Sequence, residues 1–492
     1  MADRSRAGIE MNFAFGEGSK PSKPNLPPAE EAPFRMLVIG DFGGHASRSE
    51  VRSLAGLRPQ RVDLDSFPGL FAKLGPKLQI RLGEQPPFTL ALKDLDAFHP
   101  DQLFASSEFF APMRELRRQL QNPETFAVAA VMVGSVRPPA PAPSQQQVAE
   151  HTEDLQRLLG RAPSTPVVVP ATPTSIVDNL MRQAVAPNLV AKADPRQADM
   201  VASVDGMTGE LMRAVLHDVG FQQLEALWRG LDGLVRTLEL DENLQVFVLD
   251  VGRDELAADF ASAGDLIDSA MYRLVVDQAG EKPWSLLVLG GQIRRGKDDA
   301  ALLARLGTLA QSVQAAVVAG MDFSTWKTGF SSVEDQGAWS ALRNSPAAGA
   351  IALAAPSVLV RLPYGKDTDA VERFAFTEQT LPPMGERYLW GSAAISVAQL
   401  IAQSYAAAGG WDFTPGDEHV VGDLPLHITK QDGESVQTPC AQAWLPESAI
   451  DALIKDGIVP MVSAQGRGEV RMPRLQSLAS PPAALTGRWQ TG

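Results

Sequence analysis

The segment GQIRRGKD (residues 291–298) contains the residue types of a phosphate-binding loop. It follows an apolar run and precedes a run with helical periodicity, as such loops do. The pattern needs Ser or Thr after the lysine to meet magnesium, and this chain has Asp298 there. Arg294 and Arg295 also stand where the backbone must approach the phosphates. We therefore predict a strand-to-helix turn with Asp298 or Asp299 as N-cap, and keep a nucleotide-hydrolysing enzyme as an alternative.

Two further segments contain residue types that bind metals. IGDFGGH (39–45) includes the Asp-Phe-Gly triplet of kinases, but the other kinase motifs do not accompany it. DFTPGDEH (412–419) contains three acidic residues and His419, without the spacing of an EF-hand or a helical metal site. Both segments are typical of turns, where glycine supplies backbone freedom. We expect neither a metal site nor a cofactor.

The remaining candidates for catalysis are scattered along the chain. The six histidines never stand at helical spacing from one another, and no Gly-x-Ser-x-Gly motif or Cys–His pairing surrounds a nucleophile. We therefore expect no catalytic residues, and we expect that the protein is not an enzyme.

The bulk composition limits the classes of partner. The 492 residues include 58 acidic and 44 basic side chains, for a formal net charge of -14 and a pI near 5.0. This sign disfavours binding to nucleic-acid phosphates or anionic lipids. A hydrophobic content of 45% is enough for several globular cores. We expect protein partners and no nucleic acid.

Cysteine usage and hydropathy indicate the compartment. The single Cys440 excludes an intramolecular disulfide and a cysteine-clustered metal site, which fits a reducing environment. The N-terminus lacks the apolar segment of a signal peptide, and no window reaches the ~18 apolar residues of a membrane-spanning helix. We expect a cytoplasmic protein that does not insert into membranes.

A proline-rich stretch divides the elements that must position these segments. Eight of the 37 prolines lie between Pro138 and Pro173, where they favour extended geometry over helix or sheet. We predict a linker at 136–175 with a short helix inside it, at 145–162. Leu155, Leu158 and Leu159 share one face of that helix.

The N-terminal part is predicted to form a small α/β domain at 34–135, after an extended arm at 1–33. Apolar or alternating runs predict strands, and helical spacing predicts helices between them. The strands are predicted at 34–44, 78–82, 88–92 and 126–133, and the helices at 67–74 and 101–121.

The C-terminal part is predicted to form a larger α/β domain at 176–480, followed by a tail at 481–492. Strands are predicted at 244–251, 284–291, 315–320 and 350–365, and helices up to 238, from 253 and at 298–313. Because strands and helices alternate at the spacing of βαβ units, we expect a mixed or mostly parallel central sheet flanked by helices on both faces.

The C-terminal part resembles the large sheath subunit of type VI secretion systems (TssC or VipB). FQQLEALWRGLDGLV (221–235) is similar to a helix of that family, with Glu225, Trp228 and Arg229 in place. WSALRNSPAAGAIALAAPSVLVRLPYG (339–365) is similar to its Trp-x-x-x-Arg helix, the next strand and an Arg-Leu-Pro-Tyr-Gly signature. Four shorter segments follow in the family's order, at 388–411, 422–427, 457–462 and 475–478.

The N-terminal part resembles the small sheath subunit (TssB or VipA). FRMLVIGDFGG (34–44) stands where that family has a Leu-Gly-Asp-Phe strand. RVDLDSFPGLFAKLGPKLQIRL (61–82) and LKDLDAFHPDQLF (92–104) are similar to its next two motifs. The chain thus resembles a small and a large sheath subunit fused in one polypeptide, although both parts end earlier than the resembled subunits do.

The resemblance implies a sheath-protein fold and a structural role in a contractile sheath. The implied partners are copies of the chain or other sheath subunits, an inner tube protein, baseplate proteins and an AAA+ unfoldase that recognises a short helix. We place that recognition on Leu155, Leu158 and Leu159. The alternative is a non-polymerising adaptor or cap at the sheath end or baseplate, which the shorter C-terminus would explain.

Six residues within the resembled motifs are candidates for interface or fold-signature roles, because tryptophan and arginine often anchor interfaces and arginine can pair with a carboxylate of the same fold. These are Trp228, Arg229, Trp339, Arg343, Arg361 and Tyr364.

Overall fold

The computed structural model describes residues 32–84, 86–136, 194–279, 282–379, 385–431 and 433–490. The predicted arm up to residue 31 and the predicted linker from residue 137 onward, with Leu155, Leu158 and Leu159, lie outside the described residues. Each helix among the described residues is too short or too polar to cross a membrane.

The described chain separates into two compact units, each treated by itself below. Unit 1 comprises the described parts of Met1–Pro76, Gln223–Val360 and Trp390–Gly492, and unit 2 those of Lys77–Gln222 and Arg361–Leu389. Each unit therefore takes segments from both sides of the predicted linker, so compactness divides the chain differently from the domain boundaries expected from the sequence.

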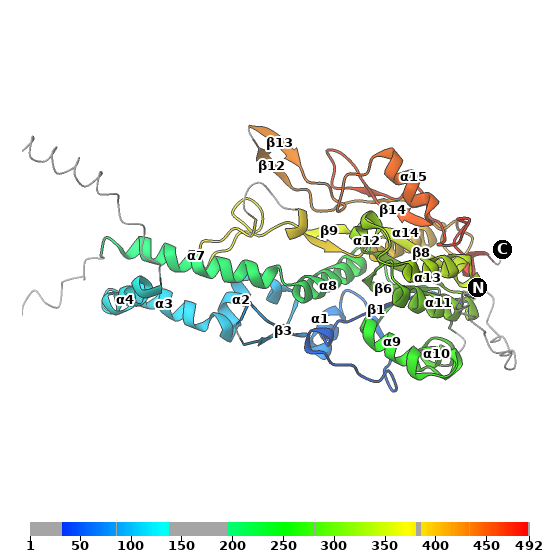
Figure 1. The fold of residues 1–492 in the computed structure, drawn as a ribbon, viewed down its shortest axis with the longest axis horizontal. Coiled ribbons are helices and arrows are strands. Elements are labelled where there is room, and N and C mark those ends of the chain that lie inside the picture. The colour runs from blue at the N-terminus through cyan, green and yellow to red at the C-terminus, as the bar shows by residue number, and fades with distance from the viewer. Residues whose placement is uncertain are drawn as a thin grey trace, which may run out of the picture. The chain divides into compact units, whose positions relative to one another are not determined.

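The elements before the predicted linker include four strands and four α-helices among the described residues, labelled in Figure 1 where space allows. The strands are β1 (Phe34–Gly40), β2 (Gln60–Val62), β3 (Lys77–Ile80) and β4 (Phe88–Ala91). The helices are α1 (Phe67–Leu74), α2 (Pro100–Ser106), α3 (Ala111–Gln121) and α4 (Phe126–Val136).

The described elements after the linker include longer helices and the remaining strands. The helices are α7 (Gln197–Leu216), α8 (Val219–Thr237), α9 (Arg253–Ser262), α10 (Ala270–Tyr272), α11 (Lys297–Ser312), α12 (Phe323–Thr328), α13 (Val333–Asn344), α14 (Ala393–Ala408) and α15 (Glu447–Lys455). The strands are β5 (Leu244–Asp250), β6 (Leu286–Ile293), β7 (Ala316–Met321), β8 (Ile351–Ala355), β9 (Val358–Arg361), β10 (Leu389–Gly391), β11 (Val420–Val421), β12 (Ile428–Gln431), β13 (Glu434–Gln437), β14 (Ile458–Pro460), β15 (Val462–Ser463) and β16 (Val470–Arg471).

The central sheet of unit 1 has the strand order β14-β8-β7-β6-β1-β5-β2. Its neighbouring strands are parallel except β2 and β5, which are antiparallel. The sheet is therefore mixed and mostly parallel, which confirms the predicted α/β fold class. Strand β1 lies between β5 and β6, with Phe34 opposite Leu244 and Met36 opposite Leu286. A strand from the N-terminal part thus occupies the interior of a sheet built largely from the C-terminal part.

Helices cover both faces of this sheet. Leu37 and Ile39 of β1 belong to a buried cluster that includes Leu303 and Leu306 of α11. Residues that alternate with them along the strands, such as Val38, are also fully buried, on the face where α14 contacts β6 and β7 and where Leu227 of α8 meets Gly40. Because both faces are covered, the strands consist of nearly continuous apolar runs, as parallel strands usually do.

Two glycines let α8 approach the sheet closely. A Cβ atom added at Gly40 of β1 would lie 2.8 Å from a methyl carbon of Leu227, and one added at Gly290 of β6 would lie 2.2 Å from the other. A side chain at either position would force the Leu227 side chain to shift. Gly40 and Gly290 therefore have a packing role against Leu227.

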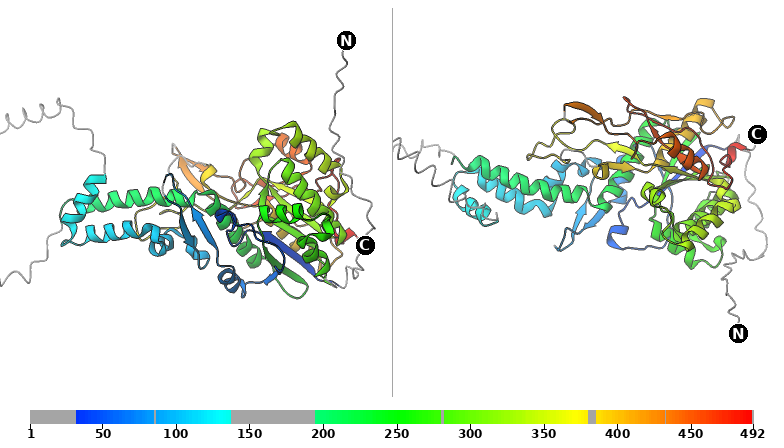
Figure 2. Two further views of the ribbon diagram at one scale, coloured as in Figure 1. Left: turned by 60° about the horizontal axis from the view of Figure 1, so that its bottom comes forward. Right: turned by 45° about the horizontal axis from the view of Figure 1, so that its top comes forward.

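Unit 2 is built around helices α3, α4 and α7, which lie side by side in Figure 2 and contact one another. Phe126, Ala129 and Val133 of α4 pack with Leu120 and Val204 in a small buried cluster. The antiparallel hairpin β3–β4 also belongs to this unit, and both of its strands were predicted.

The segment 126–133 is helical, so its prediction as a strand was wrong. A continuous apolar run does not distinguish a buried strand from a helix by its period. Here only one face of α4 is buried, at spacings of three and four residues, while Val128 and Val131 remain 64% and 72% exposed. The valines favoured the strand interpretation, although two of the three in this segment are exposed.

The tryptophans are unevenly distributed between the units. All eight fall within the ranges of unit 1, and the ranges of unit 2 contain none. Intrinsic fluorescence therefore reports on unit 1.

Candidate functional site

The loop after β1 is held by acidic side chains at the carboxyl ends of two adjacent strands. Asp41 Oδ1 accepts a hydrogen bond from the backbone N–H of His45 at 2.7 Å, and Oδ2 accepts one from Ala46 at 2.9 Å. Asp250, the last residue of β5, accepts one from the N–H of Gly43 at 2.8 Å. The conformation of the Gly-Asp-Phe-Gly-Gly loop thus depends on both parts of the chain.

Arg52 extends this connection. Its Nε donates to Glu255 Oε1 at 2.8 Å, and its Nη1 lies 3.2 Å from Asp250 Oδ2. Burial raises the pKa of Asp250 above its usual range, against the opposing effect of Gly43, His45 and Arg52. Burial acts in the same direction on Glu255, but the hydrogen bonds from Arg52 and Gly252 prevail and lower its pKa.

Asp41, His45 and Asp250 are close enough together to be tested as a metal site. Their donor atoms are already used within the chain. His45 Nδ1 is 3.0 Å from Asp41 Oδ1, so this nitrogen faces a hydrogen-bond acceptor and not an open coordination position. The oxygens of both carboxylates have N–H donors, and Arg52 supplies the compensating positive charge. These residues form a network of hydrogen bonds that fixes the loop after β1 to the end of β5, and we propose no metal there.

Trp228 is fully buried in unit 1. Its Nε1 donates to the carbonyl oxygen of Phe42 at 3.0 Å. Its ring contacts those of Phe42, Phe67 and Phe71, with centroid distances of 5.0, 5.6 and 4.3 Å. Because these three phenylalanines come from the N-terminal part, Trp228 joins the two parts by packing and is not available at the surface.

Arg229 lies next to Trp228 but has a different environment. Its Nε donates to Glu225 Oε1 at 2.7 Å, one turn earlier in α8. Glu225 is completely buried, and the Arg229 side chain is 23% exposed. The pair neutralises a carboxylate that would otherwise be costly to bury.

Trp339 and Arg343 lie one turn apart on α13. Trp339 is 3% exposed within the main cluster of unit 1. Arg343 Nε donates to the carbonyl of Leu478 at 3.1 Å, and Nη2 donates to that of Lys455 at 3.2 Å. Burial lowers the pKa of Arg343. This arginine therefore connects α13 to the C-terminal segments of the same chain.

Arg361 forms a buried ion pair in unit 2. Its Nη1 is 2.8 Å from Glu378 Oε2, and its guanidinium carbon lies 4.1 Å from the ring centroid of Tyr364. The backbone N–H of Tyr364 donates to the same carboxylate at 2.8 Å, and His217 Nε2 lies 3.4 Å from Oε1. Burial alone would raise the pKa of Glu378, but Arg361 and these donors hold it below its usual range.

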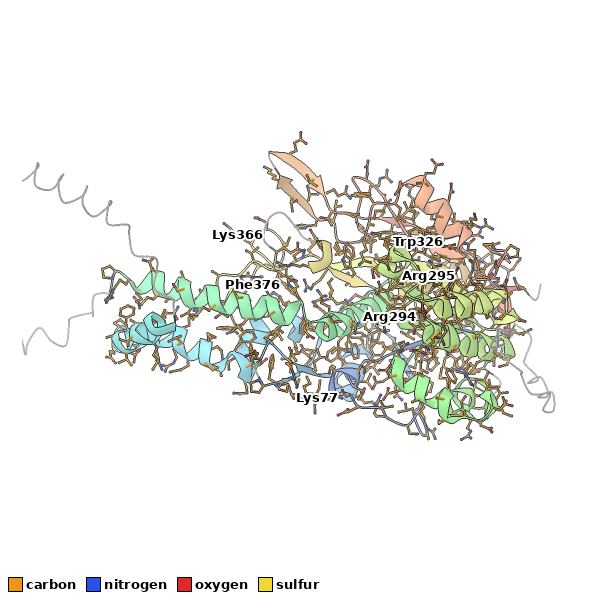
Figure 3. All side chains as sticks on the ribbon, viewed as in Figure 1. Lys77, Arg294, Arg295, Trp326, Lys366 and Phe376 are labelled. Carbon is orange, nitrogen blue, oxygen red and sulfur yellow. The ribbon has the colours of Figure 1, made fainter. Side chains whose placement is uncertain are left out.

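The segment 291–298 forms a strand-to-helix turn as predicted, but its N-cap is Gly296. The expectation of Asp298 or Asp299 was wrong, because both lie in the first turn of α11, and Asp299 accepts from the N–H of Arg294 at 2.7 Å. Arg295, labelled in Figure 3, lies over the ring of Phe330 at 4.0 Å.

The lysine of this turn is also engaged within unit 1. Lys297 Nζ is 3.2 Å from Glu334, and its backbone N–H donates to Asp335 at 2.9 Å. The atoms that would bind a phosphate therefore already contact carboxylates of α13.

The structure brings the six predicted residues into three separate groups. Trp228 and Arg229 lie on α8, Trp339 and Arg343 on α13, and Arg361 and Tyr364 around one carboxylate. Sequence reasoning missed Glu378, Arg52 and Asp250, which have no local motif. Among the described residues, segment 412–419 forms no cluster of three close metal ligands.

Two family models match this chain, in different segments. The family model for VipB, described as EvpB/VC_A0108, tail sheath N-terminal domain, matches residues 198–478. The model for the type VI secretion system protein VipA matches residues 21–126 of the same chain. Type VI secretion system sheath protein TssC1 of Pseudomonas aeruginosa is 27% identical over 304 residues. That alignment covers 57% of this chain and 61% of the relative, so the chain spans less than two thirds of the relative's length.

Proposed function

Because the chain belongs to the family of the EvpB/VC_A0108 tail sheath N-terminal domain, and also matches VipA, we propose that it is a structural component of a type VI secretion-like contractile sheath. It assembles with copies of itself or with other sheath subunits around an inner tube protein. It acts in the cytoplasm, without catalysis or a cofactor.

The observation that supports this proposal most strongly is the position of β1. This strand lies in the VipA-like segment, and its two neighbours, β5 and β6, lie in the VipB-like segment. Two segments that match separate families therefore complete one sheet. A single chain can then supply both components of a sheath building block, and covalent linkage fixes their ratio at one to one.

The proposed assembly can be tested by negative-stain electron microscopy of the purified full-length chain. We expect long tubules, alone or after co-expression with a tube protein. Discrete rings or monomers under both conditions would contradict polymerisation and support the alternative of an adaptor or cap at the sheath end or baseplate.

The unfoldase partner is proposed on the predicted helix at 145–162, which lies outside the described residues. Deletion of that segment should abolish binding of an AAA+ unfoldase, and so should replacement of Leu155, Leu158 and Leu159 by serine. Binding of the deleted chain with unchanged affinity would exclude this role for the helix.

A nucleotide-hydrolysing role is disfavoured by the turn before α11. Since Lys297 already faces Glu334, a titration with ATP and magnesium should give no saturable binding for the natural chain or for Lys297→Ala. Saturable binding that Lys297→Ala removes would overturn the non-enzymatic assignment.

A further inference from the structure

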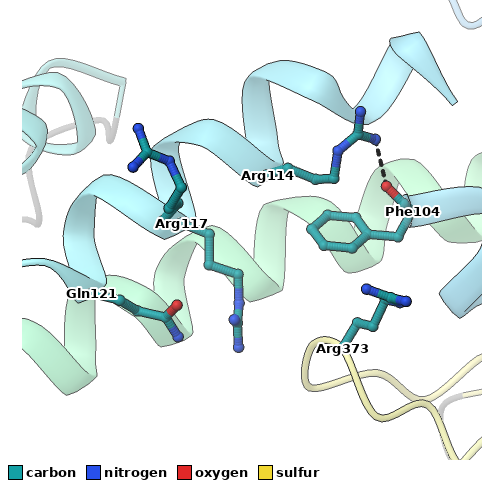
Figure 4. Close-up of a pocket in the computed structure, with 6 residues that line it drawn as sticks. Phe104, Arg114, Arg117, Gln121 and Arg373 are labelled. Atoms are coloured by element: carbon teal, nitrogen blue, oxygen red, sulfur yellow. Dashed lines mark hydrogen bonds between the residues drawn. The ribbon is translucent and has the colours of Figure 1, made fainter. Parts of the chain in front are cut away.

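Unit 2 carries a pocket lined mainly by arginine. The pocket has a volume of about 270 Å³ and is open to solvent. Its lining residues are Phe104, Arg114, Arg117, Arg118, Gln121 and Arg373, drawn in Figure 4. This concentration of positive charge contrasts with the net charge of -14 of the whole chain.

Two of the four guanidinium groups are neutralised within unit 2. Arg117 Nε is 2.8 Å from Asp205 Oδ1, an ion pair that joins α3 to α7. Arg118 Nη2 is 2.6 Å from Glu115 Oε1 on the same helix. These two arginines therefore bring little unbalanced charge to the pocket.

The other two guanidinium groups have no anionic partner among the described residues. Arg114 donates to the carbonyl oxygens of Phe104 and Ser107, which are neutral acceptors. Arg373 uses its backbone N–H to bind Asp101 at 2.9 Å, and its side chain forms no hydrogen bond or ion pair with the described residues. Two positive charges thus remain uncompensated on either side of Phe104 (Figure 4).

The spacing along α3 indicates an elongated ligand. Arg114, Arg117, Arg118 and Gln121 are separated by three and four residues, so they form one stripe along the helix. Seven residues of helix rise by ~10 Å. The charged contacts of a ligand would fall on Arg114 and Arg373, and the rest of a peptide segment could follow the stripe, which a single small anion could not do.

We propose that this pocket binds an acidic segment of a partner protein, with carboxylates facing Arg114 and Arg373 and an apolar side chain next to Phe104. Guanidinium groups bind carboxylates through two parallel hydrogen bonds, which gives both affinity and orientation. A nucleic acid is the poorer ligand, because only two guanidinium groups of the pocket remain uncompensated, whereas proteins that bind nucleic acid neutralise several phosphates. The proposal does not depend on sheath assembly.

The test is fluorescence anisotropy of a labelled decaglutamate peptide titrated with the full-length chain at low salt. Arg373→Glu should weaken binding at least ~10-fold, the factor expected when one charge-assisted pair becomes repulsive. The matched control is Lys366→Glu, since Lys366 is also exposed in unit 2, changes the net charge equally and does not line the pocket. This control should weaken binding by no more than about twofold.

Three outcomes would overturn the proposal. Equal weakening by both variants would indicate non-specific attraction, and unchanged binding by Arg373→Glu would exclude the pocket. Tighter binding of a single-stranded oligonucleotide, with the same dependence on Arg373, would assign the pocket to phosphates. Hydrogen exchange of α3 and α7 should be unchanged in both variants, which shows that unit 2 is still folded. If Arg373→Glu still forms tubules, the sheath assignment holds whether or not the pocket binds the peptide.

Discussion

Both compact units combine the VipA-like and VipB-like segments, but they do so through different interactions. In unit 1, β1 is bonded to β5 and β6 through backbone ladders with a defined register. In unit 2, α3 of the VipA-like segment contacts α7 through side chains, including the ion pair between Arg117 and Asp205. When the register of a strand slips by one residue, all its side chains move to the opposite face of the sheet, whereas packed helices tolerate small shifts. The sheet therefore specifies how the two segments combine, and the helices add adjustable contacts.

The largest effect should come from a charge placed in β1. Val38→Asp introduces a carboxylate at a fully buried position with no partner, so we expect loss of more than ~4 kcal/mol and failure of unit 1 to fold. The failure of unit 1 to fold can be measured by the soluble yield and by tryptophan fluorescence. The control is Val131→Asp on α4, which is 72% exposed and should change stability by less than ~0.5 kcal/mol. Equal losses of stability in the two variants would contradict the conclusion that the sheet, and not the helices, specifies how the two segments combine.

Removing the tryptophan that joins the two segments should have the next largest effect. Trp228→Ala leaves a cavity among three phenylalanines and should cost roughly 4 kcal/mol in urea unfolding followed by fluorescence. Trp228→Phe retains most of the packing but loses the hydrogen bond to Phe42, so about 1–2 kcal/mol is expected. Similar costs for the two variants would mean that packing contributes little.

In unit 2 the most sensitive position should be the buried pair of Arg361 and Glu378. Arg361→Met leaves the carboxylate buried without its partner, which should cost roughly 3 kcal/mol. The measurement is hydrogen exchange of unit 2, because fluorescence reports on unit 1. The double variant Arg361→Met with Glu378→Leu should recover part of the loss, and no recovery would show that Arg361 acts through packing alone.

The same pair predicts the pH dependence of unit 2. The pKa of Glu378 is lower in the folded chain, so its contribution is fully present above the unfolded value of ~4.3 and is lost as pH falls through the lower folded value. Hydrogen-exchange protection should therefore decline below pH ~4. The Glu378→Gln variant should lack this pH dependence. If hydrogen-exchange protection in that variant still declines below pH ~4, the pH dependence comes from other carboxylates.

The smallest destabilisation is expected for the ion pair between α3 and α7. Arg117→Met should cost about 1–3 kcal/mol in unit 2, because Asp205 is nearly buried and loses a charged hydrogen-bond donor. Arg118→Met, whose partner Glu115 is exposed, is the matched control and should change stability by less than ~1 kcal/mol. Hydrogen exchange of α7 distinguishes the two variants.

Local patterns were sufficient to predict the long strands, because β5, β6, β7 and β8 are apolar runs between helical segments, but the short strands β2 and β10 to β16 were not predicted. They were insufficient for α4, where an apolar run is only half buried. The order of strands in the sheet was not predictable either. Nothing in residues 34–40 indicates that their neighbours are β5 and β6, since pairing depends on residues far along the chain.

The candidate residues show the same limit. Arginine in the Arg-Leu-Pro-Tyr-Gly signature was expected to pair with a carboxylate, but Glu378 lies 17 residues later in a segment without periodicity. Trp228 was considered for an interface, although its partners Phe42 and Phe67 come from the VipA-like segment. Residue type indicated the kind of interaction in both cases, and only the fold identified the partner.

The central position of β1 also affects the synthesis of the chain. The ribosome releases β1 long before β5 and β6, because roughly 200 residues separate these strands. At ~5–20 residues per second, β1 exists for about 10–40 s before its first neighbour is made. During that interval an apolar strand is exposed without a partner, which makes the nascent chain a substrate for chaperones. A ribosome that stalls before β5 would therefore leave a chain that is prone to aggregate.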